Sequence, residues 1–111
     1  KELEGVVGNS IAYQKAECST KLDYINLLIK FENGRYYEAI NIATKIIDSY
    51  IMEMDWLMMF SYIVRAKSYD LIGDRKRASD DFRVASRMNS YYKAADQAKK
   101  FIKSPYKKEG E

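Results

Sequence analysis

Histidine is absent from this chain of 111 residues, and cysteine occurs only once, at Cys18. Without histidine the chain lacks the Cys–His and Ser–His pairs of nucleophilic catalysis, most zinc sites and the easiest acid–base catalyst near neutral pH. A single cysteine permits no disulfide within the chain, which fits a reducing compartment or a domain that needs no disulfide to fold. This leaves the location open, with the cytoplasm favoured. We interpret Cys18 as a small residue on a helix face. These absences indicate a protein that is not an enzyme and that needs no cofactor or metal.

Residues that break helices are also scarce, with one proline and five glycines. So few breakers disfavour a turn-rich β sandwich and favour an all-α fold. The longest nearly apolar run, Trp56 to Val64, is much shorter than the ~20 residues of a membrane-spanning helix, so we expect no membrane span. The chain starts at Lys1 rather than at a methionine, and we therefore expect it to be a piece of a larger protein.

Apolar residues recur at intervals of three and four along most of the chain, which is the spacing of helices with one buried face. These stripes predict helices over 20–32, 35–50, 55–72, 74–88 and 90–103, and a further helix near 9–18, about six in all. A capping box, Thr20 followed by Asp23, is expected to start the first of these stripes. Gly34 and Gly73 are expected to end helices, since glycine readily adopts a positive φ.

An internal similarity appears when the chain is shifted by 39 residues, which brings Gly34 onto Gly73 and Ala39 onto Ala78. The second copy carries small and aromatic residues at regular distances, namely Tyr62, Ala66, Tyr69, Gly73, Ala78, Phe82 and Ala85. This series resembles the tetratricopeptide repeat (TPR), in which two antiparallel helices cross closely at small residues. Arg65 departs from the pattern, because the family usually has leucine there.

The resemblance implies antiparallel helix-turn-helix repeats stacked into a right-handed α-solenoid. Its expected parts are an N-terminal segment over 1–19, repeats over about 20–50 and 55–88, a capping helix over 90–103 and a flexible tail over 104–111. The domain proper would cover 20–103. We also expect the segment around Ile11, Ala12 and Ala16 to form a helix that packs on residues 20–33, either as the remnant of a preceding repeat or as a lid on the groove.

What the resemblance implies for function is a scaffold for protein–protein interaction, part of a larger protein, that binds a peptide or partner helix in a concave groove. The groove would be lined by the first helix of each repeat, through the side chains of Tyr24, Leu28, Phe31, Ile63, Lys67 and Asp70. Met52, Met54, Met58 and Met59 are interpreted as core-filling residues. Adjacent Asp80 and Asp81 are interpreted as solvated side chains, because they point about 100° apart on a helix.

Two other functions stay open at this point. Residues 1–64 carry a net charge of −3 and residues 65–111 a net charge of +6, so the second half could bind nucleic acid. The residues concerned would be Arg75, Lys76, Arg77, Lys99 and Lys100. However, the aromatic residues belong to the apolar stripes instead of alternating with these cations. The third possibility is a homo-oligomer formed through an open end of the array.

Overall fold

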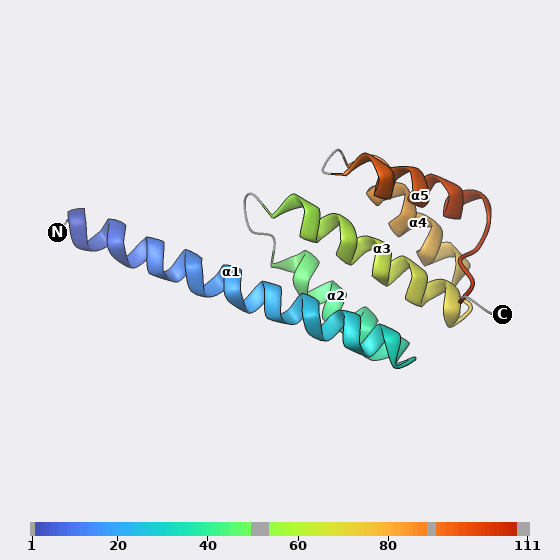
Figure 1. The fold of residues 1–111 in the computed structure, drawn as a ribbon, viewed down its shortest axis with the longest axis horizontal. Coiled ribbons are helices and arrows are strands. Elements are labelled where there is room, and N and C mark those ends of the chain that lie inside the picture. The colour runs from blue at the N-terminus through green and yellow to red at the C-terminus, as the bar shows by residue number, and fades with distance from the viewer. Residues whose placement is uncertain (1, 50–53, 89–90, 109–111) are drawn as a thin grey trace.

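The computed structural model describes residues 2–49, 54–88 and 91–108, and the side chains among them other than those of 2–10 and 13. These residues form five helices and no strand (Figure 1). The helices are α1 (Glu2–Glu32), α2 (Tyr36–Asp48), α3 (Asp55–Leu71), α4 (Arg75–Ser86) and α5 (Tyr92–Lys103). The all-α fold is confirmed, and α2 to α5 follow the predicted stripes to within three residues at each end.

The sixth helix does not exist as a separate element, because the two N-terminal helices expected from the sequence are one continuous helix. Thr20 does not cap a helix, since its hydroxyl donates a hydrogen bond of 2.9 Å to the carbonyl of Ala16, one turn earlier in α1. No glycine or proline lies between Ala16 and Thr20 to interrupt the helix. The predicted capping box is therefore wrong, and residues 9–18 cannot fold back onto residues 20–33.

Gly34 and Gly73 end α1 and α3 with the same turn. Their φ angles are 76° and 86°, in the region that only glycine enters without strain. In the first turn the N–H of Arg35 donates to the carbonyl of Lys30 at 2.9 Å, and in the second the N–H of Asp74 donates to that of Tyr69 at 2.8 Å. The predicted role of both glycines is confirmed. The two turns lie 39 residues apart and use equivalent donors and acceptors.

Each helix packs against its neighbours in sequence, and α1 also touches α3 (Figure 1). One core cluster joins α3, α4 and α5 around Phe82, and a second joins α1, α2 and α3 around Leu27 and Leu57. Met54, Met58 and Met59 are buried, as predicted, while Met52 lies outside the described residues. The N-terminal part of α1 extends beyond the other helices.

The packing of α3 against α4 generates a prediction. Ala66 and Ala78 are fully buried in the same cluster, so a larger side chain at Ala66 has no room. We expect Ala66→Leu to lower the free energy of unfolding by about 1–3 kcal/mol, the usual cost of overpacking. The control is Ala12→Leu on an exposed part of α1, which should change it by less than ~0.5 kcal/mol. Equal effects in chemical denaturation would contradict this packing.

A second prediction concerns Ser61, whose hydroxyl is buried in α3 and, among the described residues, makes no hydrogen bond. Leaving a buried polar group unsatisfied costs ~1–3 kcal/mol. Ser61→Ala should therefore stabilise the protein. The matched control is Ser68→Ala in the same helix, because the equally buried Ser68 hydroxyl donates to the carbonyl of Val64 at 2.8 Å. Thermal denaturation should rank the Ser61 variant above the Ser68 variant.

Candidate functional site

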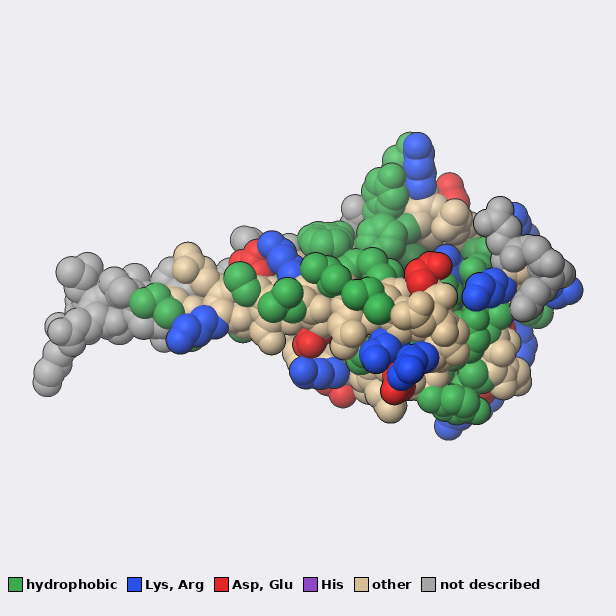
Figure 2. All heavy atoms as spheres, turned by 60° about the horizontal axis from the view of Figure 1, so that its bottom comes forward, with side chains coloured by type: hydrophobic (Ala, Val, Ile, Leu, Met, Phe, Trp, Pro, Cys, Tyr) green, Lys and Arg blue, Asp and Glu red, His purple; other side chains and the backbone are tan. Residues whose placement is uncertain are grey.

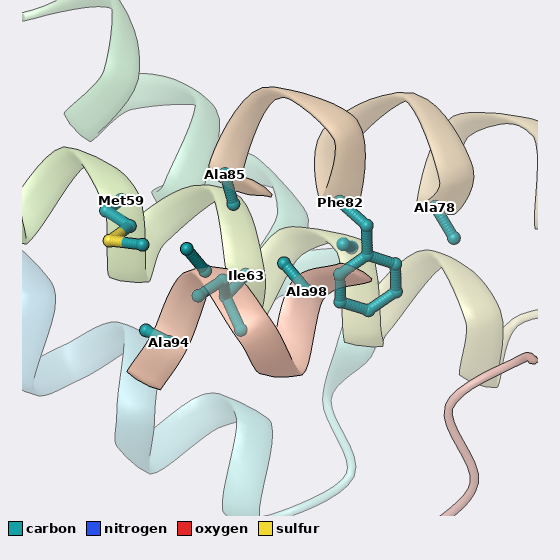
Figure 3. Close-up of a cluster of buried hydrophobic side chains, with 9 residues drawn as sticks. Met59, Ile63, Ala78, Phe82, Ala85, Ala94 and Ala98 are labelled. Carbon is teal, nitrogen blue, oxygen red and sulfur yellow. The ribbon is translucent and has the colours of Figure 1, made fainter. Parts of the chain in front are cut away.

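The six side chains predicted to line a groove lie in α1 and α3, but the structure does not leave all of them accessible. Ile63 is only 5% exposed and belongs to the cluster that α5 covers, beside Ala94 and Ala98 (Figure 3). It is therefore a core residue in this structure. Leu28, by contrast, is exposed on the surface of α1.

Tyr24 is half-buried in the part of α1 that faces the start of α3. Its ring packs edge-on against Trp56, with 6.2 Å between ring centroids. Burial raises the pKa of the Tyr24 hydroxyl above its usual range. This side chain therefore packs as part of the contact between α1 and α3.

The remaining three, Phe31, Lys67 and Asp70, meet around a residue that the sequence analysis did not single out. Tyr106 lies in the segment after α5, and its N–H donates a hydrogen bond of 2.8 Å to the Asp70 carboxylate. Its ring lies 6.3 Å from that of Phe31, and the Lys67 ammonium lies 4.9 Å from the centroid of the Tyr106 ring. The segment expected to be a flexible tail is thus held against α1 and α3 at Tyr106.

Two further residues complete this arrangement. The Arg75 guanidinium donates to both oxygens of Asp70, at 2.8 and 3.0 Å, and to the backbone carbonyls of Phe101 and Ile102, the latter at 2.8 Å. The Phe101 ring packs edge-on against Tyr106 at 5.3 Å. We call the set of Phe31, Lys67, Asp70, Arg75 and Phe101 the Tyr106 site.

The electrostatics of the Tyr106 site follow from burial. The Asp70 side chain is only 1% exposed, and a buried carboxylate is tolerated because Arg75 and the Tyr106 N–H satisfy it. Burial lowers the pKa of the Lys67 ammonium, while the nearby Glu32 carboxylate opposes this shift. The site therefore offers an acceptor for a backbone N–H, aromatic walls and a cation above the ring. It can hold an extended segment that carries an aromatic side chain.

Arg65 and Asp81 form a second polar cluster, which corrects the interpretation of Asp81 as a solvated residue. Asp81 is 6% exposed, and the Arg65 guanidinium donates to its two carboxylate oxygens at 2.7 and 2.8 Å. Arg65 also donates to the Thr44 hydroxyl at 3.1 Å, which ties α2, α3 and α4 together. Asp80, by contrast, is exposed as predicted.

The pKa shifts of this pair have identifiable causes. Hydrogen bonding to Asp81 raises the pKa of the Arg65 guanidinium, which therefore stays charged. Burial raises the pKa of the Asp81 carboxyl, and the hydrogen bonds from Arg65 oppose that shift. The sequence did contain a signal for this pair, namely Arg65 at a position where the TPR family usually has leucine. A cation at a buried position requires a partner. The sequence does not say which carboxylate provides it.

The cations proposed for nucleic-acid binding do not form a single free surface. Arg75 is bound to Asp70 and to the end of α5, and Arg77 pairs with Asp74 at 2.7 Å. Lys76, Lys99 and Lys100 are exposed. A cleft beside the Gly73 turn includes Lys76 and Arg77 among its lining residues, but none of the six predicted groove residues.

Metal sites and membrane-spanning helices have no candidate among the described residues. No group of three or more acidic or cysteine side chains there could hold a metal ion, and no helix there combines the length and apolarity needed to cross a membrane. Compared with known proteins, the chain matches no family model, no curated protein and no solved structure.

The Arg65–Asp81 pair yields a prediction about stability. Removing one partner leaves an uncompensated charge, so Arg65→Met and Asp81→Leu should each cost about 3–5 kcal/mol. The double variant should cost much less than the sum of the two, because no unpaired charge remains. The matched control is the exposed pair Asp80–Arg83, 3.4 Å apart, where the same cycle should give a coupling below ~1 kcal/mol. Additive losses at Arg65 and Asp81 in urea denaturation would contradict the pairing.

Proposed function

We propose that this chain is a non-catalytic protein–protein interaction module of TPR-like architecture, which binds an extended peptide at the Tyr106 site. The equivalent turns at Gly34 and Gly73 support the repeat architecture. Pairs of buried residues that lie 39 positions apart in the sequence support it too. Each member of the following pairs is at most 1% exposed: Leu27 and Ala66, Ala39 and Ala78, Ala43 and Phe82, Ile46 and Ala85.

The observation that carries the proposed binding function is the way the chain's own segment is held at Tyr106. A backbone N–H bound to Asp70 and a ring between Phe31, Phe101 and Lys67 are contacts that a separate peptide could make equally well. Main-chain hydrogen bonding supplies affinity in such complexes, and a pocket for one side chain supplies specificity. A partner would therefore present an aromatic residue in an extended stretch and would take the place of Tyr106.

The test uses a variant of the domain that lacks its own segment around Tyr106. A variant that ends at Lys103 is titrated with a fluorescent peptide of residues 103–108, whose sequence is KSPYKK. We expect saturable binding measured by fluorescence anisotropy, because truncation opens the Tyr106 site to solvent. The same peptide with Tyr106→Ala should bind at least about tenfold more weakly, since it lacks the ring.

Two domain variants locate the binding surface. Lys67→Ala should weaken binding of the native peptide by removing the cation above the ring. Lys93→Ala, on the exposed side of α5, should leave it unchanged. Circular dichroism must show that the truncated domain keeps its helix content. If that folded domain does not bind the peptide, the proposed function is contradicted.

A further inference from the structure

A line of exposed side chains runs along the outer face of α1. It consists of Ile11, Lys15, Cys18, Leu22, Ile25 and Ile29, and we call it the α1 seam. Its four large aliphatic residues are 48–65% exposed. Figure 2, which faces α1, shows hydrophobic side chains in a row along the helix. The seam spans about 27 Å at the helical rise per residue.

The seam lies opposite the face by which α1 joins its own domain. That inner face carries Thr20, Tyr24, Leu27 and Phe31, which are buried or half-buried. At 100° per residue, the mean directions of the two faces differ by about 170°. Among the described side chains of α1, Thr20 is the first buried one, so those described between Ile11 and Ser19 have little packing of their own. An isolated helix is marginal in water, and an apolar outer face of this size marks a contact surface.

The spacing of the seam suits packing against a second helix. Its successive intervals are 4, 3, 4, 3 and 4 residues, an average close to the 3.5 at which two helices pack along a common stripe. The order of intervals is the same in both directions. A second copy of α1 that runs antiparallel and is centred on position 20 therefore places Ile11 opposite Ile29, Lys15 opposite Ile25 and Cys18 opposite Leu22. Every seam residue then has a seam residue as its partner.

Charge favours the antiparallel orientation. In a parallel pair in the same register, Lys15 of one copy would meet Lys15 of the other inside the seam, which is unfavourable. In the antiparallel pair each Lys15 meets an isoleucine and can extend its ammonium to water. Lys21 of the two copies approach each other at the edge of the contact, but each lies 2.9 Å from the Glu17 carboxylate of its own helix.

We propose that this protein forms a dimer through the α1 seam, with the two α1 helices antiparallel. The contact does not include the Tyr106 site, so the proposal does not rest on the peptide-binding function. An interface of six side chains from each helix is small beside the ~1,600 Å² of a standard interface. We therefore expect a weak dimer, with a dissociation constant in the micromolar range.

Sedimentation equilibrium over the micromolar range tests dimer formation in the full chain. Leu22→Glu should abolish the dimer, because it places a charge at the centre of the seam. Lys15→Leu should tighten it by at least about tenfold, since it replaces a charged member of the seam by an apolar one. The matched control is Val84→Glu, an exposed apolar residue of α4 that is 40% exposed, which should leave the dimer unchanged. A wild-type chain that stays monomeric throughout would overturn the proposal, and so would a dimer that survives Leu22→Glu.

Disulfide trapping tests the orientation. Wild-type protein is mixed with a tagged double variant, Cys18→Ser with Leu22→Cys, and oxidised gently. The antiparallel contact places Cys18 of the wild-type copy opposite the introduced thiol at position 22 of the variant, so only mixed dimers should be cross-linked. Neither protein alone should give a cross-linked dimer, because its single thiol then faces leucine or serine. Cross-linking within each protein alone, or none in the mixture, would overturn the antiparallel arrangement.

Discussion

The buried carboxylate of Asp70 in α3 must be satisfied, and the groups that satisfy it link α3 to α4, to the end of α5 and to the segment at Tyr106. Arg75 neutralises the carboxylate from the start of α4, and the same guanidinium binds the last carbonyls of α5. The N–H of Tyr106 supplies another hydrogen bond. Because a buried charge without partners is very costly, these elements are held together at one point. The turn at Gly73, which lies between Asp70 and Arg75, must therefore keep its shape.

Much of the helical arrangement was predictable, because it depends on short-range patterns. Apolar spacing located α2 to α5, and two glycines located the turns. Both glycines have a positive φ in the structure. The start of α1 was not predictable in the same way. Thr20 can cap a helix or bind the preceding turn of one, and both arrangements satisfy its hydroxyl. The stripe of α1 was also ambiguous, because apolar residues occupy two opposite faces and spacing alone does not say which face the core covers.

The polar sites were less predictable because their partners are distant in sequence. Asp70 and Lys67 were identified as candidate binding residues, but Tyr106 lies 36 residues beyond Asp70 in a stretch without helical periodicity. The pairing of Arg65 with Asp81 spans 16 residues and depends on how α3 crosses α4. A cation at a position expected to be buried needs a carboxylate as its partner. Only the packing of the helices decides between Asp80 and Asp81, which differ by about 100° in direction.

The two faces of α1 give the helix two separate roles in the proposed scheme. Its inner face ends at Phe31, which forms a wall of the Tyr106 site, while its outer face forms the α1 seam. Contacts on opposite sides of one helix do not compete for the same side chains. Antiparallel pairing also places the bodies of the two copies at opposite ends of the contact. A dimer would therefore present two Tyr106 sites, and a partner with two aromatic peptide segments would gain affinity if its linker could span them.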